Sequence, residues 1–354
     1  MQKHLTLVSG SVLMACLTIF ALPFTKVEAA TCVANVQPVR EVVPVPATTD
    51  IANFVNSKSP DAKRQVFQLA ANTTYRVNAL ILLREGDALS GAVGTAPKVG
   101  PATDPNPTTK LVNGAALESL IALRGDNAIT WLDISGADYK GQAGGGSAIA
   151  AGSGNDNTLI RYNRIHHNGA AGITNARGHI LDNEIDNNTT EPAALGSIGS
   201  GVKGIYEYEA GCNLVHHNAG NGIWGDVLMK DTNVGSFNVH DNYVYSNGRA
   251  GVRFERNECS GAEFNAVGNS IQFNGWESVR GGVSIHDACA SPYSYVANNS
   301  FGGNADKLGV RITDSGRSDR PDTKNAIIGP NIMNGDIVKL GTGVSTSADN
   351  IVLR

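Results

Sequence analysis

Two rows of charged and aromatic residues follow a short motif that occurs six times in the chain. The motif is a glycine followed by isoleucine or valine: Gly172-Ile173, Gly201-Val202, Gly222-Ile223, Gly251-Val252, Gly282-Val283 and Gly309-Val310. The residue after each motif gives the first row: Thr174, Lys203, Trp224, Arg253, Ser284 and Arg311. Two residues further, the last four repeats give Asp226, Glu255, His286 and Thr313. Side chains alternate between the two faces of a strand, so both rows are predicted to share one outward face.

These rows contain the groups that several reactions on a sugar polymer need. A polyuronate lyase neutralises the substrate carboxylate with a cation or a carboxylate-bound Ca²⁺, and removes the adjacent proton with a base. In that scheme Asp226 and Glu255 are candidate ligands for Ca²⁺. A glycoside hydrolase needs two carboxylates, which Asp226, Glu255 and Asp287 offer, and epimerisation is a third option. The candidate catalytic residues are Lys203, Asp226, Arg253, Glu255, His286 and Arg311.

Long loops are predicted beside the same face. Gly282 follows Asn274 by eight positions, whereas in three other repeats the glycine follows the asparagine by four, and Trp276 and Arg280 fall in this loop. Loops on a rigid scaffold often carry function. The candidate substrate-binding residues are Trp224, Trp276, Arg280 and Asp287. A carbohydrate-binding protein or adhesin without catalysis would use the same face, so that alternative stays open.

A second repeat, built on asparagine, organises the chain. Six segments have the form Asn, any residue, an apolar residue, two more residues, then Asn, and they begin at Asn163, Asn183, Asn213, Asn242, Asn269 and Asn299. Successive first asparagines are 20, 30, 29, 27 and 30 residues apart. Units of this size cannot bury an apolar face alone, so they are predicted to stack as turns of a coil. Equivalent asparagines then form a ladder, each amide donating to one neighbour and accepting from the other.

A competing polar cluster follows the asparagines. In register with one another lie His166, Asp186, His216 and Tyr245, with His167 and His217 beside them. Histidine and carboxylate ligands are typical of transition-metal sites. A ladder presents its side chains in parallel, however, whereas a metal needs ligands that converge. We therefore interpret this cluster as polar stacking on the surface.

With these asparagine segments and their Gly-Ile/Val partners, the chain resembles the pectate-lyase-like superfamily of right-handed parallel β-helix proteins. The resemblance is strong from about residue 155 to 315. It implies an all-β fold, a single right-handed parallel β-helix over residues 49–354, with an N-terminal cap helix around Ile51, Phe54 and Val55. It also implies three strands per turn, with the Gly-Ile/Val segment as the first strand and its outward face as the substrate cleft. The paired-Asp and Gly-His-Gly motifs of polygalacturonases and the Asp-Pro-His-Asp motif of alginate epimerases are missing, so no signature selects a reaction.

The start of the chain has the layout of a secretory signal peptide. Lys3 precedes an apolar run, and Val27-Glu28-Ala29 offers a cleavage site, which predicts a signal peptide over 1–29, an extended lead-in over 30–48 and a secreted protein. Lipidation at Cys16 is disfavoured because the apolar run continues past it. Four cysteines remain after cleavage, and Cys259 with Cys289 is the predicted disulfide.

The net charge of the chain limits the kinds of partner that we expect it to bind. Cleavage removes two lysines and one glutamate, so the formal charge goes from −4 to −5. Such a chain has no general basic field for nucleic acid or for an anionic membrane. We expect a monomer that binds an acidic polysaccharide, with no contact to a membrane beyond the export signal.

Overall fold

All strand pairs among the described residues are parallel, and the strands form three sheets, two of which are joined by hydrogen bonds into one 20-stranded sheet. The computed structural model describes residues 40–58, 63–93, 107–141, 145–151, 158–195, 199–226, 236–255, 263–278, 280–315, 323–340 and 351–353. Besides its strands, this part of the chain contains the helix α1 (Ile51–Asn56) and the 3-10 turns η1 (Pro192–Ala194) and η2 (Ala305–Lys307). The expected all-β class is therefore confirmed.

The first sheet contains the Gly-Ile/Val segments. Its strands are β4 (Ile81–Leu82), β7 (Ser119–Leu123), β10 (Ser147–Ala151), the beginnings of β13 (Ile173–Leu181) and β15 (Ser200–Gly211), β17 (Asn221–Asp226), β20 (Val252–Glu255), β23 (Val283–His286), β26 (Leu308–Thr313) and β29 (Ile337–Leu340). Strands β13 and β15 continue into the second sheet, so hydrogen bonds connect these two sheets directly.

The second and third sheets complete each turn. The second contains β1 (Glu41–Val45), β2 (Gln65–Leu69), β5 (Ala88–Ser90), β8 (Ala128–Thr130), β11 (Leu159–Arg161), the ends of β13 and β15, β18 (Phe237–His240), β21 (Phe264–Val267), β24 (Cys289–Ala297), β27 (Lys324–Ile328) and β30 (Ile351–Leu353). The third contains β3 (Thr74–Val77), β6 (Thr109–Asn113), β9 (Leu132–Ser135), β12 (Arg164–His166), β14 (Glu184–Asp186), β16 (Leu214–His216), β19 (Tyr243–Tyr245), β22 (Ser270–Gln272), β25 (Ser300–Gly302) and β28 (Ile332–Asn334).

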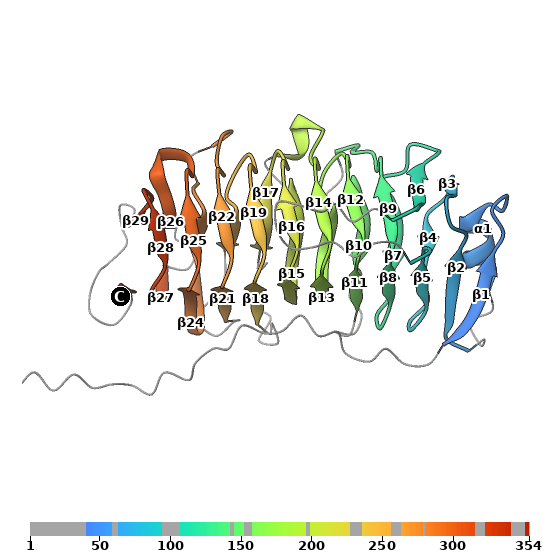
Figure 1. Ribbon diagram of the computed structural model, residues 1–354, viewed down its shortest axis with the longest axis horizontal. Helices are drawn as coiled ribbons and strands as arrows, with labels where there is room; N and C mark the ends of the chain where they lie inside the picture. Colours follow the sequence, from blue (N-terminus) through green and yellow to red (C-terminus); the bar gives the residue numbers. More distant parts are fainter. Residues whose placement is uncertain are drawn as a thin grey trace, which may run out of the picture.

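The chain passes through the three sheets in order and then starts the next turn. From β17 onward each consecutive trio of strands adds one strand to each sheet, so equivalent segments lie side by side along the coil (Figure 1). This arrangement is a parallel β-helix, as the repeat predicts. The strand that contains the Gly-Ile/Val motif of one turn lies directly beside the corresponding strand of the preceding turn.

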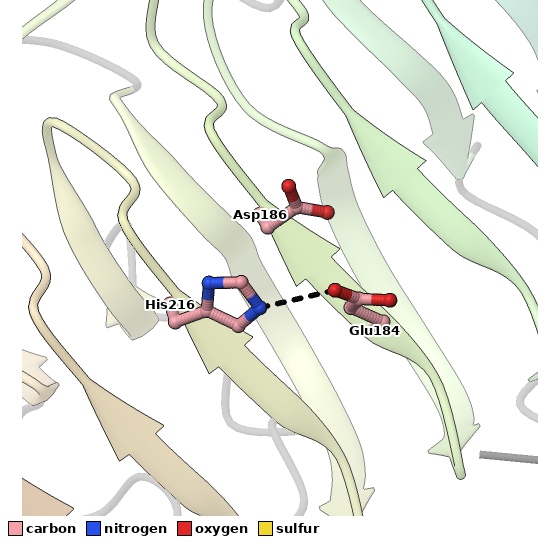
Figure 2. Close-up of side chains that lie close together, drawn as sticks. All are labelled: Glu184, Asp186 and His216. Atoms are coloured by element: carbon pink, nitrogen blue, oxygen red, sulfur yellow. Dashed lines mark hydrogen bonds and ion pairs between the residues drawn. The ribbon is translucent and has the colours of Figure 1, made fainter. Parts of the chain in front are cut away.

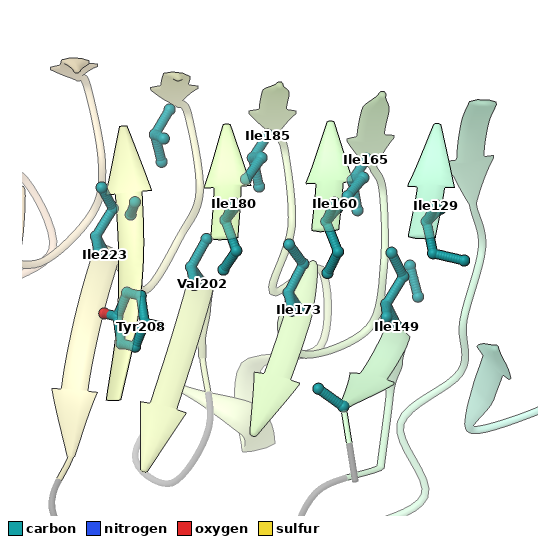
Figure 3. Packing of buried hydrophobic residues seen from close by; sticks show 14 of the residues in the cluster. Ile129, Ile149, Ile160, Ile165, Ile173, Ile180, Ile185, Val202, Tyr208 and Ile223 are labelled. Carbon is teal, nitrogen blue, oxygen red and sulfur yellow. The ribbon is translucent and has the colours of Figure 1, made fainter. Parts of the chain in front are cut away.

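The interior of the coil is a column of aliphatic side chains. The predicted inward residues are Ile173, Val202, Ile223, Val252, Val283 and Val310, and each is fully buried. Isoleucines from the other two sheets meet them inside the same coil, such as Ile160 and Ile180 opposite Ile165 and Ile185 (Figure 3). Because no single turn can bury this surface, the stack is the unit that is stable.

Two asparagine ladders run along the corners at the two ends of the third-sheet strands. In the first, the side-chain amide of each member donates to the side-chain oxygen of the next: Asn163, Asn183, Asn213, Asn242, Asn269, Asn299 and Asn331. The second joins Asn168, Asn188, Asn218, Asn247, Asn274 and Asn304, and ends on Asp336. The predicted ladder is confirmed.

The backbone bend at these corners lies at the residue before the asparagine. The left-handed conformation belongs to the residue before each ladder asparagine except Asn331, for example Tyr162, Asp182 and Cys212, with φ of 60°, 54° and 53°. The asparagine itself supplies the hydrogen bonds. Its amide caps a carbonyl on the neighbouring strand, as Asn213 does for Ile180 at 2.8 Å.

Helix α1 lies at the N-terminal end of the coil, beside β1 to β4 (Figure 1). The carboxylate of Asp50 accepts a hydrogen bond from the backbone of Asn53 at its first turn. Ile51 and Val55 enter the core, and Phe54 packs edge-on against Phe67. Within the predicted lead-in, residues 41–45 form β1 and pair with β2.

Parts of the sequence-based interpretation fall outside the described residues. The predicted signal peptide, 1–29, and residues 30–39 of the lead-in are among them. Cys212 and Cys289 each take part in a disulfide, but Cys259 lies outside the described residues, so its pairing with Cys289 stays a prediction. No helix within the described ranges is long and apolar enough to cross a membrane.

Candidate functional site

The outward side of the first sheet, here called the first-strand face, has the register that the sequence predicts. Its first row runs through the paired residues Thr174, Lys203, Trp224, Arg253, Ser284 and Arg311. Its second row runs through Asp226, Glu255, His286 and Thr313. The strand ladder therefore brings all six candidate catalytic residues onto one face.

Lys203, Trp224 and Asp226 form one group at the N-terminal side of this face. The ammonium group of Lys203 lies 2.9 Å from Asp226 Oδ2 and 4.1 Å from the centre of the Trp224 ring. All three side chains are buried, with exposed fractions of 8% or less. The Trp224 ring is therefore covered, with the Lys203 ammonium group and the Arg253 guanidinium group over it, and it is not open to a stacking sugar.

Arg253 and Glu255 form a second group, one turn further along. The guanidinium of Arg253 pairs with the carboxylate of Glu255 and lies 5.1 Å from the centre of the Trp224 ring. Burial lowers the pKa of Arg253, repulsion from Arg249 acts in the same direction, and Glu255 and Asp226 oppose the shift. Because Asp226 and Glu255 each hold a cation already, a Ca²⁺ ion would have to displace those cations to bind there.

Two further arginines approach this pair from the beginning of their turns. Arg249 and Arg280 each stand three residues before a core valine, Val252 or Val283, and these valines are paired in register. Burial, followed by repulsion from Arg253 and Arg249, lowers the pKa of Arg280 to about 10. Within the described part of the chain, neither Arg249 nor Arg280 has a carboxylate within ion-pair distance.

Arg249 was missed by the sequence-based reasoning, although its signal was available. It precedes the Gly-Val motif and so lies outside the two rows read from the strand. Its position matches that of Arg280 on the next turn. Burial lowers the pKa of Arg249, while Glu255 and Glu277 oppose the shift.

His286 supplies the basic group on this face. Its Nδ1 lies 2.8 Å from the hydroxyl of Thr313, and its Nε2 lies 3.4 Å from Asp287 Oδ2. Burial lowers the pKa of His286, Asp287 opposes the shift, and Arg253 and Arg280 reinforce it. The imidazole is therefore neutral near pH 7 and able to accept a proton.

Trp276 and Asp287 lie differently from each other. Trp276 is 58% exposed, and its ring nitrogen donates to the carbonyl of Ser246, which directly follows a strand of the third sheet. Its ring is thus open at the corner that leads into the first sheet. Asp287 is buried behind His286 and accepts a hydrogen bond from the backbone of Ser315.

The third sheet carries the competing cluster, and its members converge more than a ladder of parallel side chains would. His216 Nε2 turns toward the preceding turn and lies 3.1 Å from Glu184 Oε1, with Asp186 beside them (Figure 2). Arg164 reaches Asp186 at 3.3 Å and Glu184 at 3.6 Å. Stacking is present too, since the rings of His216 and Tyr245 lie 4.8 Å apart and nearly parallel.

The same sheet contains two similar chains of carboxylate and imidazole groups. In one, Asp133 lies 2.8 Å from Nε2 of His166, whose Nδ1 lies 2.7 Å from that of His167. In the other, Glu184 contacts His216, whose Nδ1 lies 2.8 Å from that of His217. The sequence did not reveal the carboxylates, because Asp133 and Glu184 stand more than 30 residues before the histidines that they contact.

Comparisons with known proteins give only distant similarities of shape. No protein-family model matches the chain, and no curated protein sequence matches it. The A-modules of the mannuronan C-5 epimerases AlgE6 and AlgE4 from Azotobacter vinelandii align over 86% and 82% of this chain and 93% and 91% of their own, at 16% and 15% identity and TM-scores of 0.36 and 0.39. The tailspike gp49 of Acinetobacter baumannii bacteriophage Fri1, a capsular polysaccharide depolymerase, aligns over 90% of this chain and 63% of its own, at 11% identity and a TM-score of 0.40. Scores at this level carry no argument about activity.

Proposed function

We propose that this protein is a secreted polysaccharide-acting β-helix that binds an acidic polymer on the first-strand face and cleaves it by β-elimination. The observation that carries the proposal is the pair Arg249 and Arg280, half-buried beside Arg253 without a carboxylate partner of their own among the described residues. Like charges at such a site repel one another and cost stability. A bound anion would remove that cost, so the site favours a negatively charged ligand.

A uronate carboxylate fits this arrangement. A guanidinium forms two parallel hydrogen bonds to a carboxylate, and Arg280 is only half-buried, so ligand can reach it. Arg253 stands on the neighbouring turn and repels Arg280, and a bound carboxylate would relieve that repulsion. Neutralising the uronate makes the proton on the adjacent ring carbon easier to remove.

The reaction then needs a base, and His286 is the candidate. The neutral imidazole takes the proton next to the uronate carboxylate. The electron pair that is left forms a carbon–carbon double bond as the glycosidic C–O bond breaks, and the leaving oxygen takes a proton from solvent. Epimerisation shares the first of these steps and differs in returning a proton to the opposite side of the carbon, so the two reactions differ in product and not in the groups they need.

The proposal includes features of the molecule predicted from the sequence. These are cleavage of a signal peptide after Ala29, a right-handed coil capped by α1, and a monomeric mature protein. N-terminal sequencing of protein recovered from the medium or periplasm tests the first, with Ala30 as the expected first residue.

A panel of polymers tests the activity. Mature protein is incubated with polygalacturonate, alginate and a neutral glucan, and products are followed by ultraviolet absorbance of unsaturated uronides and by reducing ends. Absorbance from at least one polyuronate, with none from the glucan, supports the lyase. Reducing ends without absorbance would make the protein a hydrolase, an altered uronate composition without cleavage would make it an epimerase, and binding without any product would make it a binding protein. Each of these three outcomes contradicts β-elimination.

A further inference from the structure

The third sheet brings three metal-ligating side chains together at a place that the proposed activity does not use. Glu184 and Asp186 project from β14, and His216 projects from the neighbouring β16. One donor atom from each lies within 4.8 Å of the other two, and all three residues are buried (Figure 2). The group thus spans two adjacent turns of the coil.

The charges around this group do not balance. Within the described ranges, the buried carboxylates here are Asp133, Glu184 and Asp186, and one guanidinium, that of Arg164, lies among them. Lys110 reaches only Asp133, at 4.0 Å, and its side chain is 53% exposed. Glu184 Oε2 is buried and receives no hydrogen bond from a described residue, and the Arg164 guanidinium lies 3.6 Å away. Buried carboxylates that share one guanidinium repel one another, so further positive charge would stabilise this place.

We propose that Glu184, Asp186 and His216 bind a divalent transition-metal ion, with Zn²⁺ as the preferred occupant. One imidazole with two carboxylates is a donor set that suits zinc. Calcium instead takes six to eight oxygen ligands, so a nitrogen donor among three ligands argues against it. The ion would join β14 to β16 across the turn.

Neighbouring side chains hold these ligands in place. The Nδ1 of His216 lies 2.8 Å from the Nδ1 of His217, which leaves the Nε2 of His216 directed at Glu184. The side-chain amide of Asn187 donates to Asp186 Oδ2 at 2.6 Å. Contacts of this kind to ligating side chains raise metal affinity by fixing their orientation.

Arg164 competes with the ion for the same carboxylates. Its guanidinium lies 3.3 Å from both oxygens of Asp186 and 3.6 Å from Glu184 Oε2. Its side chain is 33% exposed, whereas that of Asp186 is fully buried. Arg164 is therefore able to swing into solvent when an ion enters, while Asp186 stays in place.

Because of this competition, replacing Arg164 and replacing a metal ligand should change the affinity for Zn²⁺ in opposite directions. Tag-free protein, stripped with a chelator, is titrated with Zn²⁺ in a calorimeter, and its unfolding midpoint is measured with and without Zn²⁺. Wild-type protein is expected to bind one ion per chain and to unfold at a higher temperature in its presence. Glu184→Gln and His216→Gln should weaken binding at least about tenfold. Arg164→Gln should tighten it by roughly tenfold, because the competing charge is gone. The control His167→Gln, an exposed histidine on another turn, should change nothing.

Two results would overturn the site. One is the lack of saturable Zn²⁺ binding in both wild-type protein and Arg164→Gln, which keeps every ligand even where the ligand variants fail to fold. The other is binding that His216→Gln leaves unchanged and His167→Gln weakens, since surface histidines alone would then hold the metal. Neither result bears on the first-strand face, whose substrate binding is measured separately.

Discussion

Arg249 and Arg280 occupy equivalent positions on neighbouring turns, and both repel Arg253 electrostatically. Each precedes a fully buried valine by three residues, and the two valines are paired in register. Burial lowers the pKa of each arginine, and repulsion from Arg249 contributes to the lowered pKa of both Arg253 and Arg280. Such a group of like charges does not stabilise the fold by itself, which is why we propose that it binds an anionic ligand.

The pH dependence of cleavage should report His286. Because burial lowers its pKa from the ordinary value of 6.5, the imidazole stays an active base at more acidic pH than a free histidine. The acidic limb of kcat/KM is therefore expected below pH 6.5. Asp287→Asn removes the carboxylate that opposes this shift, so the limb should move to still lower pH. A limb above pH 6.5, or one that survives in His286→Gln, would exclude His286 as the base.

A histidine–carboxylate group on the second sheet should make stability depend on pH. Glu209 contacts His179 at 2.5 Å and His240 at 2.8 Å. Hydrogen bonds from these histidines lower the pKa of Glu209 from 4.5 to about 2, so its stabilisation is present above pH 4.5 and is lost as the pH falls toward 2. Burial alone would lower the pKa of His240, but its bonds to Glu209 and Asp241 raise it above 6.5, so its stabilisation is lost as the pH rises beyond that value.

The two effects together define the window. The free-energy difference of unfolding between wild type and Glu209→Gln should be largest at about pH 5.5 and smaller at about pH 3 and pH 9. Urea unfolding at the three pH values measures it. A difference that does not change with pH would show that the group contributes packing and not charge.

The asparagine ladder should account for a measurable part of the stability. Asn213 is fully buried, donates to Ile180 and Asn242, and accepts from the backbone and side chain of Asn183. Replacement by alanine leaves several buried groups without partners, each of which costs about 1–3 kcal/mol. Asn213→Ala should therefore destabilise the protein by at least about 3 kcal/mol.

A second asparagine pair provides the control. Asn265 donates to Asn238 at 2.9 Å, and both side chains are only partly buried. Asn265→Ala should cost less than about 1 kcal/mol. Equal losses for Asn213→Ala and Asn265→Ala, measured by urea unfolding, would contradict the special role of the ladder.

Two buried tyrosines should respond in opposite ways to loss of their hydroxyl groups. The Tyr208 hydroxyl lies in the core without a hydrogen-bond partner among the described residues, and burial raises its pKa above the ordinary value. Tyr208→Phe should stabilise the protein by about 1 kcal/mol. Tyr75 is equally buried, but its hydroxyl donates to Val45 and accepts from Ala70, so Tyr75→Phe should destabilise by about 1–3 kcal/mol. The same sign for both variants in thermal unfolding would refute this difference.

The fold and the strand register could be predicted from the repeat, because each turn has similar residue types at equivalent positions. Ile223 and Val252 had to point inward, and Trp224 and Arg253 outward, once the turns were stacked. The contacts between side chains could not be predicted as well. Lys203 pairs with Asp226, which stands one turn away and two residues further along the strand, and long side chains choose among several such neighbours.

Turn lengths explain the rest of what the sequence did not reveal. Asp133 and Glu184 meet histidines that lie 33 and 32 residues later, while the spacing between turns varies from 20 to 30 residues. Which side chains meet on neighbouring turns therefore depends on the length of the loop in each turn. The burial of Trp224 beneath Lys203 could not be predicted either, because nothing in the spacing distinguishes a covered ring from an open one.

The most direct test of the account is the affinity of the first-strand face for an oligouronate. Lys339 pairs with Arg311 in the same row of the same sheet, but it is exposed and lies beyond the arginine group, so Lys339→Gln is a control that removes the same charge. Calorimetry with wild type, Arg280→Gln and Lys339→Gln should show binding at least about tenfold weaker for Arg280→Gln and unchanged for Lys339→Gln. Arg280→Gln should also keep or raise the unfolding temperature, since it relieves repulsion. Equal affinity in all three proteins, or a loss in Arg280→Gln that accompanies unfolding, would contradict the assignment of this face to an acidic polysaccharide.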